Sequence, residues 1–290
     1  MMLITYPLMA SIQEISARVG RVTGRGIAGN VCRHYPGWLL QIIVVLLFVA
    51  NAVNIGADLG AMGDALKLLL PAPASLYVVL FGVVCILAQT FLHYALYVRM
   101  LKWLCLSLFA YVAALATVHV PWGEALKGLV IPRLTWSTDF LTTMVAIAGT
   151  TISPYLFFWQ AAEEAEDMRV KPERTPLKFA HHQAPAAFAR IRADTLVGMA
   201  FSNVIAIAII ITTAATLHGN GVTDIESSAQ AAEALKPVAG EFAYLIFTLG
   251  IIGTGLLAVP VLAGSAAYAL GEGRRWPGAG HFQELCSTRP

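Results

Sequence analysis

Apolar residues occur in long runs along the chain, separated by shorter polar segments. A run of about 20 residues can cross the roughly 30 Å hydrocarbon core of a bilayer as a helix, because a helix rises about 1.5 Å per residue. Six runs meet this requirement, and a seventh at the N-terminus is shorter and interrupted by Pro7, Gln13 and Glu14. The predicted helices lie near 1–17, 38–59, 76–97, 101–120, 140–160, 195–217 and 242–270. The pattern predicts an all-α, polytopic membrane protein with about seven transmembrane helices in a single transmembrane domain, residues 1–270.

The polar segments between the runs carry positive charge unevenly. Of the 19 basic residues, 15 fall on one side of the predicted membrane and four on the other. Cytoplasmic loops of membrane proteins carry the excess of Lys and Arg. This bias places the segment 161–194, predicted as a loop, in the cytoplasm together with the C-terminus. The tail 271–290 is polar and rich in Gly and Pro, which predicts a disordered tail.

The amino-acid composition excludes several classes of protein. The chain is 58% hydrophobic and only 12% charged, whereas soluble domains carry about 25% charged residues. This excludes an ordinary soluble enzyme and a disordered protein. The net charge of +2 is too small for a nucleic-acid-binding surface. The expected partner is therefore the lipid bilayer, and we expect no nucleic acid.

Short motifs give little support to an enzymatic function. The four cysteines are scattered without C-x-x-C spacing, and neither H-E-x-x-H nor G-x-S-x-G occurs. We therefore expect neither a zinc site nor an enzyme. The segment Gly24–Gly29 matches G-x-G-x-x-G, but it lies in an arginine-rich loop with no strand before it, so we expect no dinucleotide site.

The run near 140–160 contains a proline at the depth of the membrane centre. Pro154 has no amide hydrogen and its ring clashes with the preceding turn, so it frees the carbonyl of Thr150, four residues back. Gly149, Thr151 and Ser153 surround this point. Non-helical backbone at this depth persists only where it faces protein or a wet cavity, and carbonyls and hydroxyls are hard ligands suited to a cation. The alternative is a simple kink whose carbonyls are satisfied by Ser and Thr hydroxyls.

A second unusual stretch follows Trp38. Asn51, Asn54 and Asp58 are spaced at i, i+3 and i+7, so they share one face of the predicted helix. A carboxylate within a span is costly and often marks an ion or proton path. The alternative is that Asp58 lies at a helix end already in water, because this apolar stretch is long.

Several segments, in order along the chain, resemble helices of one transporter family. QEISARVGRVTGRGIA (13–28) is similar to the family's second helix, NIGADLGAMG (54–63) to its third, GTTISPYLFFWQ (149–160) to its sixth and GIIGTGLLAVPVLAG (250–264) to its eighth. The family is that of the Nramp-type divalent metal ion transporters, with a LeuT-like fold. The chain looks closest to their divergent bacterial members.

This resemblance implies a partial LeuT-like helix bundle in a bacterial inner (plasma) membrane. It also implies metal contacts at Thr150, Ser153 and Tyr155, a helix break at Gly149 and Pro154, and a proton path through Asp58. The implied function is secondary transport of divalent metal cations by symport with protons. No cofactor is implied, because the divalent metal cation is the transported substrate.

The chain departs from the family pattern in two ways. Ser153 stands where the family has Met, Tyr155 where it has His, and Ala61 where it often has a second acid. Without the thioether, a harder cation or relaxed selectivity is expected. The family's first helix, with its Asp-Pro motif, and the helices after the eighth have no counterpart here. The sequence therefore leaves an alternative open: a truncated or assembly-only membrane protein without transport activity on its own.

Overall fold

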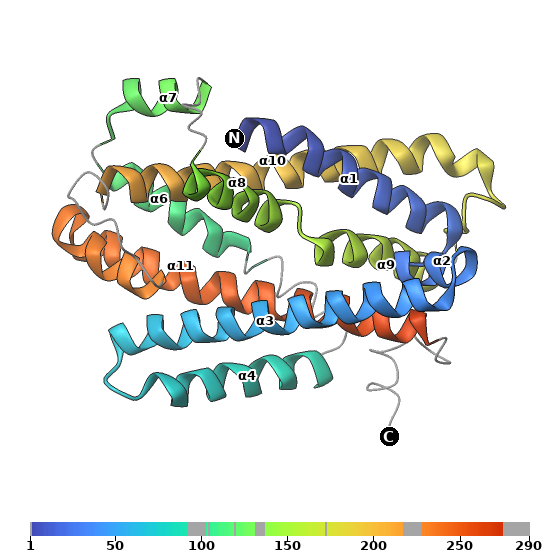
Figure 1. Cartoon of the computed structure of the whole chain (residues 1–290), viewed down its shortest axis with the longest axis horizontal. Helices are drawn as coiled ribbons and strands as arrows, with labels where there is room; N and C mark the ends of the chain where they lie inside the picture. The colour runs from blue at the N-terminus through green and yellow to red at the C-terminus, as the bar shows by residue number, and fades with distance from the viewer. Residues whose placement is uncertain are drawn as a thin grey trace. The chain divides into compact units, whose positions relative to one another are not determined.

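The computed structural model describes residues 2–91, 103, 105–118, 120–130, 137–171, 173–216 and 228–274, and these contain helices and no strand. The helices are α1 (Met2–Thr23), α2 (Ile27–His34), α3 (Gly37–Leu69), α4 (Ala74–Phe91), η1 (Cys105–Leu108), α6 (Phe109–Thr117), α7 (Trp122–Val130), α8 (Thr138–Thr151), α9 (Pro154–Val170), η2 (His181–Gln183), α10 (Ala184–Thr216) and α11 (Ser228–Gly273) (Figure 1).

Five helical segments in the described residues are long and apolar enough to cross a membrane. They are Gly37–Leu69, Ala74–Phe91, Phe140–Arg169, His181–Thr216 and Leu245–Gly273. The chain is therefore an all-α, polytopic membrane protein.

The helices extend further than the apolar runs alone indicate. The segment 161–194, predicted as a loop, is helical at both ends, because α9 continues to Val170 and α10 already begins at Ala184. Residues 161–170 are rich in Ala and Glu, which are strong helix formers, and the ion pair between Glu166 and Arg169 spans one helical turn. The described residues between α9 and α10 form a loop and the short helix η2.

Helix α11 runs through Pro260 without interruption. The short helix α2 has no counterpart among the apolar runs. Parts of the predicted helices 76–97 and 101–120, and the tail beyond residue 274, lie outside the described residues.

The chain divides into two compact units. The first comprises Met1–Val53, Pro132–Phe201 and Val261–Leu285. Its core contains Ala28, Leu40, Val44, Leu47, Phe158 and Ala269. In this unit α1 packs closely on α9, because Gly20 brings its backbone against the backbone of Ala161 and leaves no space for a side chain.

The second unit comprises Asn54–Ile131, Ser202–Pro260 and Cys286–Pro290. Its core is formed by Met62, Tyr77 and Phe81, with Leu59, Leu66, Ala72, Ile252 and Leu256 packed around it. Here too a glycine allows close approach, since the side chain of Met62 fills the space beside Gly255.

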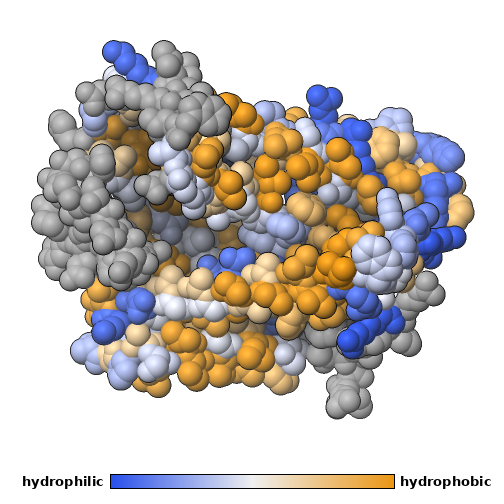
Figure 2. Space-filling model, viewed as in Figure 1, coloured by the Kyte–Doolittle hydropathy of each residue, from blue (hydrophilic) through white to orange (hydrophobic). Residues whose placement is uncertain are grey.

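Large apolar side chains remain exposed along the long helices, as a lipid solvent requires. On α3, Leu46 and Val53 are 64% and 68% exposed. Hydrophobic residues cover much of the face shown in Figure 2, and hydrophilic residues gather at the end where α1 meets α2. Exposed apolar side chains along the helices and charged residues near their ends are typical of membrane helices.

Candidate functional site

The run containing Pro154 forms two helices, α8 and α9, rather than one. α8 ends at Thr151, Ile152 leaves the helical region with φ −104° and ψ 63°, and Ser153 is extended. Pro154 is the first residue of α9. A proline disfavours the helical conformation in the residue before it and is itself well suited to the first turn of a helix. The local sequence therefore explains both the end of α8 and the start of α9.

The carbonyls at the end of α8 accept hydrogen bonds from a neighbouring hydroxyl. The hydroxyl of Ser153 lies 2.7 Å from the carbonyl oxygen of Thr150 and 3.3 Å from that of Gly149, within donating distance of both. The hydroxyl of Thr151 donates to the carbonyl of Ile147 at 2.8 Å. A carbonyl oxygen has two lone pairs, so Thr150 retains a site for a further ligand. The hydrogen bonds from hydroxyl groups that a simple kink would require are therefore present. They still leave one lone pair of the Thr150 carbonyl oxygen for a cation.

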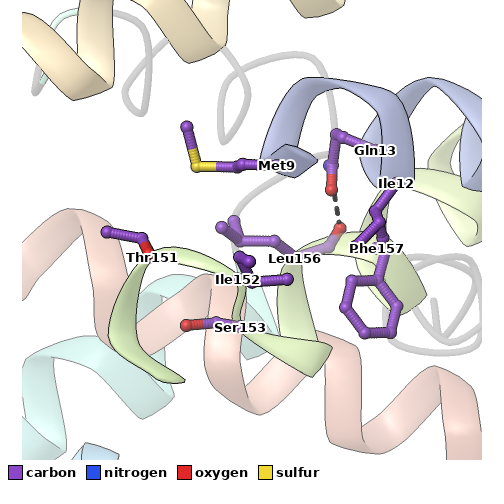
Figure 3. A pocket seen from close by; sticks show the side chains of 8 residues that line it. All are labelled: Met9, Ile12, Gln13, Thr151, Ile152, Ser153, Leu156 and Phe157. Atoms are coloured by element: carbon purple, nitrogen blue, oxygen red, sulfur yellow. Dashed lines mark hydrogen bonds between the residues drawn. The ribbon is translucent and has the colours of Figure 1, made fainter. Parts of the chain in front are cut away.

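Helix α1 supplies polar and sulfur atoms next to the α8–α9 break. Gln13 is only 5% exposed, and its Nε2 donates to the carbonyl of Leu156 at 3.1 Å. It also donates to Oε1 of Gln160 at 3.3 Å. Met9 lies over the same point (Figure 3). The sequence signal for Gln13 was a polar residue in an apolar run, but nothing in the sequence placed it beside Pro154.

A small cavity lies between α1 and the break. Its volume is about 10 Å³, and its lining comprises Met9, Ile12, Gln13, Thr151, Ile152, Ser153, Leu156 and Phe157 (Figure 3). This is near the minimum volume that holds one water molecule. Within the described part of the chain, no three His, Cys, Asp or Glu side chains are grouped to hold a metal ion. A cation at the break would therefore depend on carbonyl, hydroxyl and amide oxygens.

Tyr155 and Ser265 connect the first turn of α9 to α11. The ring of Tyr155 packs against the core of the first unit, and its carbonyl accepts a hydrogen bond from the Ser265 hydroxyl at 3.0 Å. Thr150, Ser153, Tyr155, Gly149 and Pro154 all belong to this unit, but of the three predicted metal contacts only Ser153 lines the cavity beside the break. Ser265 is a further residue of this environment that the sequence did not single out.

Asp58 belongs to the second unit, where it is half-buried on α3. The backbone carbonyl of Asp58 approaches Gly255 of α11. The two asparagines predicted to share its face differ in environment: Asn54 is exposed, while Asn51 is 2% exposed and donates to the carbonyl of Leu262 at 2.9 Å. A carboxyl group within a membrane-spanning helix is rare and often marks an ion or proton path.

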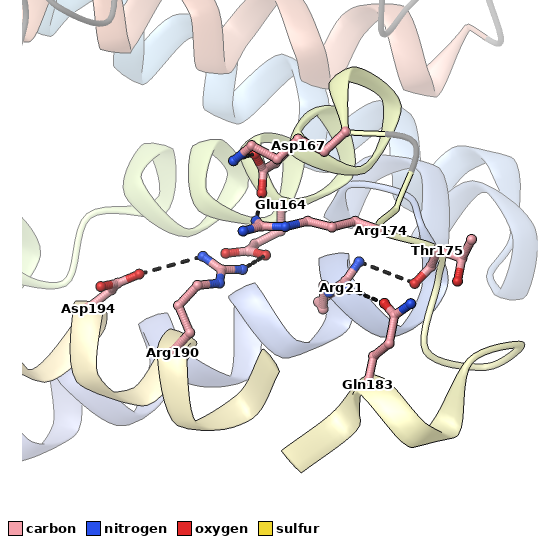
Figure 4. Close-up of polar contacts among 9 residues, drawn as sticks. Arg21, Glu164, Asp167, Arg174, Thr175, Gln183, Arg190 and Asp194 are labelled. Atoms are coloured by element: carbon pink, nitrogen blue, oxygen red, sulfur yellow. Dashed lines mark hydrogen bonds and ion pairs between the residues drawn. The ribbon is translucent and has the colours of Figure 1, made fainter. Parts of the chain in front are cut away.

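A network of charged residues joins α1, α9 and α10 at one end of the first unit (Figure 4). Arg190 bridges Glu164 at 2.6 Å and Asp194 at 3.5 Å. Arg21, only 3% exposed, donates to the carbonyl of Thr175 at 3.2 Å and to Oε1 of Gln183 at 2.9 Å. Burial lowers the pKa of the Arg21 guanidinium from its usual value, and the carboxylate of Glu164 opposes this effect. The network attaches the loop between α9 and α10 to the end of α1.

The G-x-G-x-x-G segment has a structural role at the same end. The backbone amides of Gly26 and Gly29 donate to the two carboxylate oxygens of Glu272 at 2.7 and 2.9 Å. These amides belong to the start of α2, where the helix dipole favours a negative group. The backbone amides that would bind a phosphate in a dinucleotide site are thus already bonded to a carboxylate of α11.

Comparisons with known proteins decide the family. A family model described as Nramp, natural resistance-associated macrophage protein-like, matches residues 1–280. The chain belongs to the Nramp family. The chain is 26% identical over 264 residues to a divalent metal cation transporter MntH of Pectobacterium carotovorum. The alignment covers 86% of this chain and 58% of the relative.

Two further relatives give the same picture. The MntH transporters of Acidiphilium cryptum and Klebsiella pneumoniae strain 342 are 27% and 29% identical, over 87% and 86% of this chain. The alignments cover 57% and 58% of those relatives. This Nramp chain therefore spans less than two thirds of the length of the curated relatives that it matches.

Proposed function

We propose that this Nramp chain transports divalent metal cations across the membrane and that the α8–α9 break holds the cation. The observation that carries this proposal is the interruption of a membrane-spanning segment at Ile152 and Ser153, with the Thr150 carbonyl beside it. The C-terminal end of α8 carries a partial negative charge from its last carbonyls, which favours a cation there. The names of the MntH relatives support divalent cations as substrate.

The donors around the break favour a hard cation. Ser153 contributes a hydroxyl and Thr150 a carbonyl, and such oxygen ligands suit Mg²⁺, Ca²⁺ or Mn²⁺. Thioether and thiolate ligands favour soft ions such as Cd²⁺. Among the residues that line the cavity at the break, only Met9 carries sulfur. We therefore place the substrate preference toward the harder divalent ions.

Protons are the proposed coupling ion, and Asp58 is the proposed proton-path residue. Its carboxyl group is half-buried within a candidate membrane span. Ionisable groups in such positions commonly serve proton relays.

Uptake of Mn²⁺ into proteoliposomes that contain this chain tests the proposal. We expect saturable uptake that Pro154→Ala abolishes, because alanine restores the missing amide and allows α8 and α9 to join. Pro7→Ala is the matched control, since Pro7 lies exposed within α1 without interrupting it. Absence of uptake by the unmodified chain, or equal uptake by Pro154→Ala, would contradict the proposal.

A further inference from the structure

An open groove of about 650 Å³ lies between α1 and α2, away from the α8–α9 break. Its lining residues are Ile15, Ser16, Val19, Ile27, Asn30, Val31, His34 and Tyr35. This volume falls within the range of about 300–1,000 Å³ that is usual for small-molecule sites. The groove lies entirely within the first unit, so its shape is defined by helices that are adjacent in the sequence.

Ile15, Val19, Ile27 and Val31 give the groove an apolar wall, and its polar groups are largely satisfied internally. Nδ2 of Asn30 donates to the carbonyl of Gly26 at 2.9 Å and to the hydroxyl of Thr23 at 2.9 Å. The Ser16 hydroxyl donates to the carbonyl of Ile12 at 2.8 Å. What remains for an occupant is hydrocarbon surface, including Ile15, which is 61% exposed. Such a surface suits an acyl chain.

Several features place one end of the groove at the membrane–water boundary. Tyr35 and Trp38 are 58% and 66% exposed, and exposed aromatic residues of this kind mark the interface. The charge bias along the chain predicts that α2 lies on the cytoplasmic side. The cytoplasmic leaflet is the one that carries anionic lipids.

Positive charge is available at this boundary. His34 lines the groove, and its Nδ1 already lies 2.9 Å from the carbonyl oxygen of Asn30. Arg33 does not line the groove; it is exposed next to His34 at the end of α2 and forms no ion pair with any other described residue. Arg18, by contrast, is already paired with Glu14. A guanidinium binds a phosphate group with two parallel hydrogen bonds, which gives Arg33 a natural partner in a lipid headgroup.

We propose that this groove binds one anionic phospholipid, with an acyl chain along Ile15, Val19 and Val31 and the phosphate at the rim, near Nε2 of His34 and the neighbouring Arg33. The proposal is independent of the transport function. Charge complementarity favours an anionic lipid over a zwitterionic one, and the interfacial position favours a lipid over a second protein copy.

Native mass spectrometry of the purified chain tests this site. The chain is mixed with equal amounts of phosphatidylglycerol and phosphatidylcholine that carry identical acyl chains. We expect one bound phosphatidylglycerol in excess over phosphatidylcholine, and an Arg33→Ala variant that binds phosphatidylglycerol about fivefold more weakly, as expected for the loss of one interfacial arginine. Lys67→Ala, which removes an exposed lysine at the far end of α3, should bind as the unmodified chain does.

Ile15→Trp tests the apolar part separately, because the larger ring fills the groove from an exposed position. We expect this variant to lose both lipids while its circular dichroism spectrum stays unchanged. Equal binding of the two lipids by the unmodified chain, an equal loss in Lys67→Ala, or full binding by Ile15→Trp would overturn the proposal. A lipid-free dimer would also overturn it, because a second copy would then occupy the groove.

Discussion

Ser153 is the side chain through which the chemistry of the α8–α9 break can be altered most directly. Its hydroxyl lies within donating distance of the carbonyls of Thr150 and Gly149. Replacing it with methionine substitutes a soft thioether for a hard oxygen and leaves the Thr150 carbonyl without this donor. We expect Ser153→Met to increase the ability of Cd²⁺ to compete with Mn²⁺ uptake by about tenfold, equivalent to roughly 1.4 kcal/mol.

Ser11→Met is the matched control for this change. Ser11 also donates to a carbonyl within its helix, that of Pro7 at 2.7 Å, but it is exposed on α1 and does not line the cavity. Competition between the two ions should be the same in this variant as in the unmodified chain. Identical competition in Ser153→Met would show that this side chain does not contact the cation.

Arg21 is a second residue whose contribution can be isolated. Its guanidinium is buried and donates to the Thr175 carbonyl and the Gln183 side chain, so truncation removes two charge-assisted hydrogen bonds and leaves a gap where the buried side chain packed. We expect Arg21→Ala to lower the free energy of unfolding by about 2 to 3 kcal/mol. Arg169→Ala, which removes an exposed partner of Glu166, should change it by less than about 1 kcal/mol. Thermal unfolding in detergent measures both variants, and similar values would contradict the assigned role of Arg21.

At the scale of the helices, contact between α1 and α9 depends on Gly20. A Cβ atom at this position would collide with the backbone of Ala161, which cannot rotate away as a side chain can. Gly20→Ala must therefore push the two helices apart, and we expect it to destabilise the fold by about 1 to 3 kcal/mol. Since α1 also carries Gln13 to the break, Mn²⁺ uptake should fall as well.

Gly198→Ala provides the control for Gly20→Ala. Gly198 lies within α10, and a Cβ atom there would meet no other atom within 4 Å. Alanine should raise the stability of this helix by up to about 1 kcal/mol, because glycine is the poorer helix former. Because Gly198→Ala should raise the stability and Gly20→Ala should lower it, the pair separates the effect of helix propensity from that of packing. A Gly20→Ala variant of increased stability would contradict the close contact between α1 and α9.

Sequence patterns predicted those elements whose causes are local. The apolar runs predicted the membrane-spanning helices, and Pro154 predicted the interruption near Thr150. The pairing of Gln13 with Leu156 and of Glu272 with Gly26 could not be predicted, because it joins positions 143 and 246 residues apart. Helix α2 was missed for a related reason: its eight residues are short and rich in polar groups, and its start is capped by the distant Glu272.

At the scale of the whole molecule, the proposed function requires that cation and proton movements be linked. Asp58 is the proposed proton carrier, and Asn preserves the size of its side chain without a titratable group. In proteoliposomes with an acidic exterior, the unmodified chain should take up Mn²⁺ faster than at equal pH, because protons then enter with the metal. Asp58→Asn should abolish this acceleration while leaving Mn²⁺ binding at the break unchanged, since the break is formed by other residues.

Asp64→Asn distinguishes this role from a general effect of removing negative charge from α3. Asp64 lies six residues further toward the end of the same helix, where access to water explains its charge without a proton path. Its variant should therefore keep the full response to the pH gradient. The decisive readout is the internal pH during uptake, followed with an entrapped dye. If Asp58→Asn acidifies the lumen as quickly as the unmodified chain for the same amount of Mn²⁺ imported, protons cross by another route and Asp58 serves only the structure of α3.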